Sequence, residues 1–265
     1  MKQSVISCLS PEYPWKAQFQ YFPTIGSTND ALKIMARQGA AHGTVLLAGH
    51  QTAGYGRMGR SFHSPENVGV YLSMLLRPNC KPSELMHLTC AAAVAMCDAV
   101  EKAAGFRPGI KWTNDLVYGK QKLGGILTEL GFTADGNVDY AIIGIGINCT
   151  QQQPDFAPDI REMAASLAMV TDAEIDRSLV AAAMMEALWQ MDSRLLSRRE
   201  EILVQYRTDC ITIGQDISLV RGNEIRYGKA LDVDENGALV VCFSDGTVAP
   251  VNSGEVSVRG MYGYL

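Results

Sequence analysis

The chain has 265 residues, of which 47% are hydrophobic and 19% are charged, and its formal net charge at pH 7 is −5. These values are typical of a globular protein that can bury a sizeable core in one large or two modest domains. The negative net charge argues against a general binder of nucleic acid or of membrane surfaces. Any nucleotide should therefore be bound as a small molecule by local positive charge.

The seven cysteines are scattered, with no C-x-x-C spacing. An odd count without paired spacing argues against a disulfide framework or a zinc site and favours reduced thiols in a cytoplasmic protein. The N-terminus lacks the long apolar stretch of a signal peptide. The alanine-rich run that begins at Ala91 is broken by Asp98, so we expect no membrane span.

Taken in chain order, the first 20 or so residues are expected to be irregular, since they contain Pro11 and Pro14. A capped helix is predicted next, over residues 31–37, with Ser27 or Thr28 as N-cap and Gly39 after its end. Two strands and a long helix should follow, over residues 44–48, 70–77 and 82–104.

Strands dominate the next part of the chain. One is predicted over residues 109–112, a hairpin over 115–130, and a central strand over 140–148 whose glycines mark a close approach. Helices are expected over residues 175–197 and 200–206. After residue 210 short strands separated by turns (217–220, 225–229, 239–243 and 255–258) predict a small β-barrel, so we place a domain boundary near 210.

The loop Gly54–Arg60 contains three glycines and two arginines in seven residues. Glycine lets a backbone approach a ligand closely, and arginine is suited to phosphate and carboxylate, so the loop is typical of one that folds over an anion. Its G-x-G-x-x-G spacing is also the dinucleotide-binding fingerprint. That interpretation fails because a strand rather than a helix follows, and residue 79, 20 positions beyond Gly59, is an asparagine.

Four further segments carry polar groups at strand or helix ends. Ser27, Thr28 and Asn29 begin a helix, where capping and ligand binding can coexist, and Gln51 ends a strand. The other two segments are residues 111–115, followed by Lys122 and two glycines, and residues 144–148, which end in Asn148. Each of these segments alone is also compatible with a purely structural role, as a turn, as a solvated surface side chain or as glycines that relieve crowding in a twisted sheet.

As an ordered set, these segments and the closing residues 254–259 resemble the biotin protein ligase family, in the form without an N-terminal helix-turn-helix domain. The resemblance spans roughly residues 20 to 260 and implies an α+β fold, in which a mixed or antiparallel central sheet is flanked by helices. It implies a catalytic domain over residues 1–210 and a small C-terminal β-barrel over 211–265.

The resemblance also implies a reaction. Biotin and ATP with Mg²⁺ form biotinyl-5′-adenylate, and a lysine of a biotin carboxyl carrier domain then takes the biotin. The catalytic residues would be Lys122, Arg57, Lys111 and Asp115. The biotin site would comprise Ser27, Thr28, Asn29, Gln51, Tyr55, Gly56, Arg57, Lys122 and Gly125. The ATP and adenylate site would comprise Arg57, Arg60, Asn114, Lys122 and Asn148.

Residue spacing identifies no direct metal ligands. We expect no DNA-binding module, no membrane partner and a cytoplasmic location, while a homodimer stays open. Two departures from the family pattern stand out, because the family usually has arginine at Tyr55 and proline at Thr113. Two alternatives remain: a lipoate–protein ligase, which shares the fold and the adenylation chemistry, and a non-catalytic module that binds biotin or a nucleotide.

Overall fold

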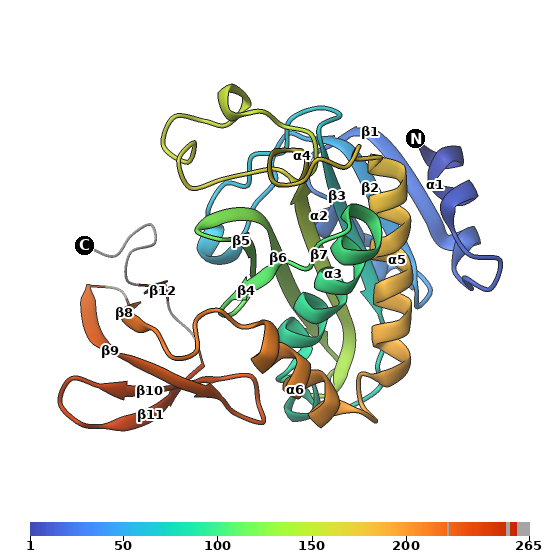
Figure 1. The fold of residues 1–265 in the computed structure, drawn as a ribbon. Coiled ribbons are helices and arrows are strands. Elements are labelled where there is room, and N and C mark those ends of the chain that lie inside the picture. Colours follow the sequence, from blue (N-terminus) through green and yellow to red (C-terminus); the bar gives the residue numbers. More distant parts are fainter. Residues whose placement is uncertain (222, 253–254, 259–265) are drawn as a thin grey trace.

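The computed structural model describes residues 1–221, 223–252 and 255–258. A seven-stranded sheet organises most of the chain (Figure 1), with the strand order β1-β2-β3-β7-β6-β5-β4. The strands are β1 Phe19–Ile25, β2 Thr44–Gln51, β3 Gly69–Leu76, β4 Gly109–Lys111, β5 Asp115–Tyr118, β6 Gln121–Phe132 and β7 Val138–Asn148. Strands β1 and β2 pair in parallel and the other neighbours are antiparallel. The predicted mixed sheet and the central position of β7 are confirmed.

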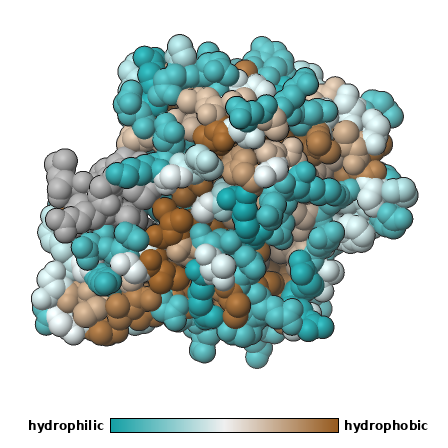
Figure 2. Space-filling view, in the orientation of Figure 1, coloured by the Kyte–Doolittle hydropathy of each residue, from teal (hydrophilic) through white to brown (hydrophobic). Residues whose placement is uncertain are grey.

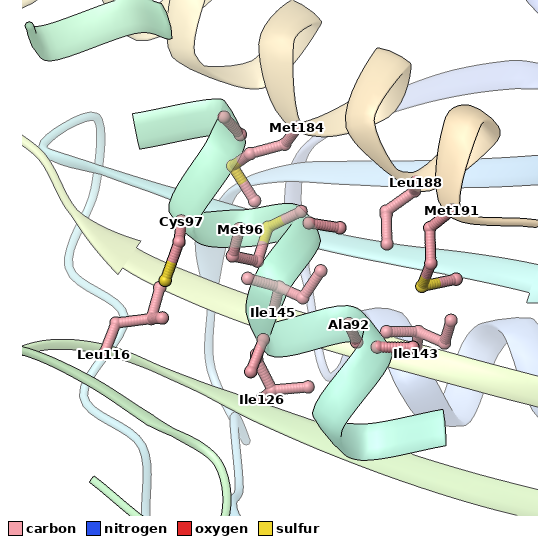
Figure 3. Close-up of a cluster of buried hydrophobic side chains, with 14 of the residues drawn as sticks. Ala92, Met96, Cys97, Leu116, Ile126, Ile143, Ile145, Met184, Leu188 and Met191 are labelled. Carbon is pink, nitrogen blue, oxygen red and sulfur yellow. The ribbon is translucent and has the colours of Figure 1, made fainter. Parts of the chain in front are cut away.

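Helices cover both faces of this sheet. Successive side chains of a strand point to opposite faces, so each strand contributes to the packing on both sides. On β7, Ile142 packs toward α2 (Thr28–Arg37), whereas Ile143 and Ile145 belong to the core on the other face. That core is closed by α3 (Leu88–Ala104) and α5 (Arg177–Arg194), which pack against each other, with α6 (Arg199–Asp209) against α3. Figure 3 shows the methionines of both helices meeting the isoleucines of the sheet.

One prediction about helices is wrong, and one helix begins later than predicted. The first residues form α1 (Lys2–Cys8), which packs on α5 through the fully buried Val5. Such a short helix depends on tertiary packing rather than on local pattern. The helix predicted over 82–104 is present as α3, and its first turn is a separate 3₁₀ turn, Pro82–Leu85. Between them, buried His87 contacts the Leu195 carbonyl through Nε2, a tertiary contact that sequence does not show.

By length and composition, the segment Pro82–Ala104 could cross a membrane, but 67% of its most apolar window is buried inside the structure. The core helix of a soluble protein passes the same test, so this is weak evidence for a span.

The C-terminal part forms a second, antiparallel sheet in the order β11-β10-β9-β8-β12. Its strands are β8 Asp216–Arg221, β9 Glu224–Val233, β10 Leu239–Phe243, β11 Val248–Val251 and β12 Glu255–Val258. Strand β11 was not predicted; it contains Pro250, which an edge strand such as β11 tolerates. Residues 254 and 259 of the closing motif lie outside the described residues, as does Gly222 of a predicted turn.

The remaining elements are short. They are the 3₁₀ turns η1 Lys16–Gln18, η2 Arg57–Gly59 and η4 Gln153–Asp155, and the helix α4 Leu167–Val170. Figure 2 shows a largely hydrophilic surface, with hydrophobic residues gathered beside the C-terminal sheet.

Trp112, just after β4, joins the two sheets. Its indole Nε1 donates to the carbonyl of Gly237, and its backbone N–H donates to Thr212 Oγ1. The side chain is only 4% exposed. Because the first sheet uses residues 19–148 and the second uses 216–258, we propose that the domain boundary lies near residue 210, between α6 and β8.

Replacing Trp112 by phenylalanine should weaken the contact between the sheets. The variant leaves the buried Gly237 carbonyl without its donor, so we expect urea denaturation to show a loss of about 1–3 kcal/mol in the free energy of unfolding. Trp15→Phe is the control, because buried Trp15 packs instead on Tyr13 and His42. An equal loss in both variants would contradict the linking role of Trp112.

Candidate active site

A cavity of about 480 Å³ lies on the face of the large sheet that α2 covers. Every residue that the sequence analysis placed in a site lines it, although the lining does not establish their roles. These residues are Ser27, Thr28, Asn29, Gln51, Tyr55, Gly56, Arg57, Arg60, Lys111, Asn114, Asp115, Lys122, Gly125 and Asn148.

Glycines form part of the sheet wall of this cavity. Along β7, the side that carries Tyr140 and Ile142 continues as Gly144 and Gly146, and Gly125 of β6 lies opposite Gly146. With no side chains there, other groups lie directly on the sheet. A Cβ on Gly144 would stand 2.1 Å from Asn29 Oδ1, and one on Gly146 would stand 2.3 Å from the Phe62 ring. The close approach predicted for these glycines is therefore made by Asn29 and Phe62.

One end of the cavity is a polar cluster at the start of α2. Ser27 caps the helix by accepting from the backbone N–H of Asp30. Gln51 Oε1 accepts from both the backbone N–H and the hydroxyl of Thr28, and its Nε2 donates to Ser64 Oγ. These hydroxyls and the half-buried amide of Gln51 form a neutral hydrogen-bonding surface suited to a small polar ligand.

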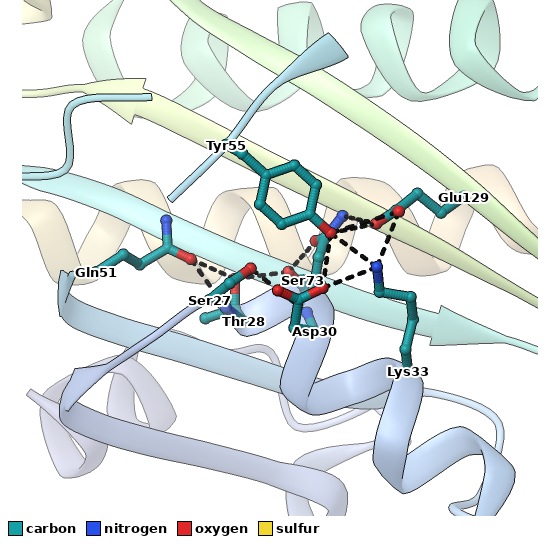
Figure 4. Close-up of polar contacts among 9 residues, drawn as sticks. Ser27, Thr28, Asp30, Lys33, Gln51, Tyr55, Ser73 and Glu129 are labelled. Atoms are coloured by element: carbon teal, nitrogen blue, oxygen red, sulfur yellow. Dashed lines mark hydrogen bonds and ion pairs between the residues drawn. The ribbon is translucent and has the colours of Figure 1, made fainter. Parts of the chain in front are cut away.

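Tyr55 joins the Gly54–Arg60 loop, hereafter the lid, to α2 and β6 (Figure 4). Its hydroxyl lies 2.8 Å from Asp30 Oδ1, 2.8 Å from Lys33 Nζ and 3.1 Å from Glu129 Oε2. Lys33 also forms ion pairs with Asp30 and Glu129, at 2.8 and 3.0 Å. Asn29 Nδ2 donates to Glu129 Oε2, so the network continues to the polar end of the cavity.

The protonation of these groups supports the network. Burial raises the pKa of Tyr55 to about 12, so the phenol keeps its proton and can donate to a carboxylate at neutral pH. Burial opposes the charged forms of Asp30 and Lys33, but their hydrogen bonds outweigh it. The pKa of Asp30 is therefore lowered and the pKa of Lys33 is raised.

The lid is held at further points. Arg57 Nη1 donates to Asn114 Oδ1 at 2.9 Å, and Asn114 Nδ2 donates to the carbonyl of Ile126. After the lid, the backbone N–H of Phe62 donates to Gly54, and the Phe62 ring packs edge-on against Tyr71. The lid thus joins β2 to β3 and crosses to the bend between β4 and β5.

Charged groups gather in the middle of the cavity. Lys122 Nζ lies 2.6 Å from Asp115 Oδ1, and Lys111 is buried beside them. Of the described residues that line the cavity, Asp115 is the only acidic one, whereas Arg57, Arg60, Lys111 and Lys122 are basic. This excess of cationic donors fits a ligand with several negative charges.

Two regions of the chain match domain families. Residues 21–148 match the biotin/lipoate A/B protein ligase family, and residues 212–259 match the biotin protein ligase C-terminal domain. The chain is 35% identical over 230 residues to the bifunctional ligase/repressor BirA of Bacillus subtilis, an alignment that covers 85% of this chain and 70% of that relative. The chain belongs to the biotin protein ligase family.

Other members of this family are similar over nearly their whole length. A Mycobacterium tuberculosis biotin–[acetyl-CoA-carboxylase] ligase is 31% identical over 251 residues, which cover 91% of this chain and 89% of the relative. The Aquifex aeolicus biotin protein ligase, solved in complex with biotin and ATP, superposes with a TM-score of 0.76. It is 26% identical, and the match covers 91% of this chain and 98% of that one. The predicted fold class and family are confirmed.

The sequence analysis missed several groups at the site. Ser73 Oγ lies 2.5 Å from Asn29 Oδ1 and 2.7 Å from Thr28 Oγ1, and Glu129 and Lys33 complete the Tyr55 network. The signal available for Ser73 was a lone hydroxyl within the apolar run of β3. Gln151, which also lines the cavity and is 1% exposed, lies between the strand predicted over 140–148 and the helix predicted over 175–197, where the sequence analysis singled out no residue.

Removing the Tyr55 hydroxyl should loosen the lid. In Tyr55→Phe the contacts with Asp30, Lys33 and Glu129 are lost. A part-exposed hydrogen bond contributes about 1 kcal/mol, so its loss should make the open form of the lid about five times more populated. Trypsin should therefore cut after Arg57 or Arg60 roughly five times faster. Tyr118→Phe, on an exposed tyrosine of β5, is the matched control. Equal cleavage rates for Tyr55→Phe and the unaltered protein would show that the network does not hold the lid.

Proposed function

We propose that this biotin protein ligase activates biotin with ATP to biotinyl-5′-adenylate and then transfers biotin to a lysine of a biotin carboxyl carrier domain. The observation that carries the proposal is the continuity of the cavity. The neutral polar cluster at the start of α2 opens onto the cationic groups Arg57, Lys111 and Lys122, beneath one lid.

In this proposal the polar end binds biotin. Its ligands are Ser27, Thr28, Asn29 and Gln51, closed by Tyr55, Gly56 and Gly125. Lys122 lies between biotin and the nucleotide, near the biotin carboxylate and the α-phosphate. The nucleotide contacts are Arg57, Arg60, Asn114, Lys122 and Asn148, and Lys111 and Asp115 complete the catalytic set.

The first step forms a bond between a biotin carboxylate oxygen and the α-phosphorus and breaks the bond to the β-phosphate, which leaves with its electrons as pyrophosphate. Two anions must meet, so the main requirement is positive charge near both rather than a protein nucleophile. Lys111, Lys122 and Arg57 provide that charge. In the second step a lysine amine attacks the acyl carbon, and AMP leaves.

Magnesium is proposed to enter with ATP. Within the described residues, no three or more His, Cys, Asp or Glu side chains lie together in a group that could hold a metal ion. Mg²⁺ usually takes one or two carboxylates together with substrate phosphates and water, and Asp115 fits that role. The ion would supply charge neutralisation on the phosphates, while Asp115 also pairs with Lys122 at 2.6 Å.

We further propose a cytoplasmic location, no binding to DNA or membranes, and a carrier domain as the protein partner, with homodimerisation open. A lipoate–protein ligase is the less supported alternative. Both family matches include biotin ligases, and the C-terminal match is specific to them. A non-catalytic module could also use the cationic centre to bind a nucleotide, so an assay of the reaction itself is needed to separate it from a ligase.

Exchange of labelled pyrophosphate into ATP tests the proposal. The protein should catalyse exchange with biotin but not with lipoate, and should then label a carrier domain with biotin. Exchange with lipoate alone would identify a lipoate ligase, and no exchange with either acid would favour a binding module.

Lys122→Ala should reduce biotin-dependent exchange by about three orders of magnitude or more, because it removes a preorganised charge from the reacting phosphate. Thermal unfolding should show that the variant is folded. Lys120→Ala is the matched control, since Lys120 is an exposed lysine in the turn of the same hairpin. Near-normal turnover in Lys122→Ala would refute the role of Lys122.

A further inference from the structure

Lys33 of α2 connects three elements of the site. Its ammonium group has three hydrogens, and three oxygens lie within hydrogen-bond distance of its Nζ. They are Asp30 Oδ1 at 2.8 Å, the Tyr55 hydroxyl at 2.8 Å and Glu129 Oε1 at 3.0 Å. Because Asp30 belongs to α2, Tyr55 to the lid and Glu129 to β6, one side chain joins the lid to both the helix and the sheet (Figure 4).

Glu129 continues this connection to the polar cluster at the start of α2. Its Oε1 pairs with Lys33, and its Oε2 accepts from Asn29 Nδ2 at 2.8 Å. A carboxylate can only accept, so Asn29 must turn its amide nitrogen to Glu129 and its Oδ1 to Ser73 Oγ, which lies 2.5 Å away. Glu129 thus fixes the orientation of a side chain that lines the cavity.

Asn29 has little room to take another orientation. It is 5% exposed and lies on the bare face of β7, where a Cβ on Gly144 would stand 2.1 Å from Asn29 Oδ1. If Glu129 turned away, the Nδ2 of this buried residue would lose its acceptor, and buried polar groups without a partner are strongly disfavoured. The geometry of the polar cluster therefore depends on Glu129, which is held in turn by Lys33.

We propose that Lys33 and Glu129 are positioning residues for the binding of biotin, which hold Asn29 of the polar cluster and Tyr55 of the lid in one hydrogen-bonded unit. The inference rests on the proposed function, because it takes the polar cluster as the biotin site. Neither Lys33 nor Glu129 is among the described residues that line the cavity, so each acts through a neighbour. Lys33 acts through the Tyr55 hydroxyl, and Glu129 acts through Asn29.

Titration calorimetry with biotin, in the absence of ATP, measures the effect. In Lys33→Met two carboxylates face the Tyr55 hydroxyl without a cation, so the Kd for biotin should rise about 10-fold. In pyrophosphate exchange the KM for biotin should rise by a similar factor. The kcat and the KM for ATP should stay within about two-fold, as expected when only binding is lost. Arg37→Met is the matched control, because Arg37 is an exposed cation of the same helix.

Further variants separate positioning from a general loss of structure. Glu129→Gln keeps the size of the side chain, but its NH₂ group must face the donor of either Asn29 or Lys33, so it should raise the Kd for biotin about as much as Lys33→Met. Lys33→Arg keeps the cation and should bind biotin within about three-fold of the unaltered protein. Since Lys33 acts through Tyr55, the double variant Lys33→Met/Tyr55→Phe should raise the Kd by clearly less than the product of the two single effects.

Two results would overturn the inference. One is a Lys33→Met or Glu129→Gln variant that is folded by thermal unfolding and binds biotin as tightly as the unaltered protein. The other is a double variant whose Kd rises by the full product of the single effects, because independent contacts give that result. An unaltered protein that binds no biotin would instead refute the proposed function, and with it the biotin site that the inference assumes.

Discussion

The register of strands β3, β7 and β6 is the constraint on which the rest of the site depends. It sets Gly146 opposite Gly125 and Gly144 opposite Ser73, so that one end of a buried sheet face carries almost no side chains. A slip of one residue would turn the isoleucines of β7 into the cavity and the glycines into the helical core. The bare face receives Asn29 from α2 and Phe62, which directly follows the lid, and so brings the polar cluster and the lid over the same surface.

Charge is the second constraint. The cavity gathers basic side chains around one acidic residue, although the whole chain is acidic. The carboxylates of Asp30 and Glu129 lie instead in the Tyr55 network, where Lys33 forms an ion pair with each of them. The resemblance to the family led us to expect an arginine at the position of Tyr55. In this chain, the cation of that network comes from Lys33 on α2, while Tyr55 supplies a neutral hydroxyl that contacts both acids.

Much of this could be predicted from the sequence, because the decisive signals were local. The glycines of β7, the lid and the segment around Lys111 each lie within a few residues, and the predicted site residues all line one cavity. The contacts of Glu129 could not be predicted, because its partners lie on other elements of the fold. The contact of Gln151 could not be predicted either, because it depends on the orientation of the neighbouring Asn148 amide. For the same reason α1 was missed, because buried Val5 finds its partners on α5, more than 170 residues away in the chain.

The central claim is that one cavity, covered by the lid when its ligands bind, brings a carboxylate to the α-phosphate of ATP and shields the resulting anhydride from water. Trapping this intermediate tests it most directly. The protein is mixed with labelled biotin, ATP and Mg²⁺, passed through a desalting column, and quenched in acid. The account predicts close to one biotinyl-adenylate per chain, which hydrolyses far more slowly when bound than when free. Failure of the label to elute with the protein, or equal hydrolysis bound and free, would contradict it.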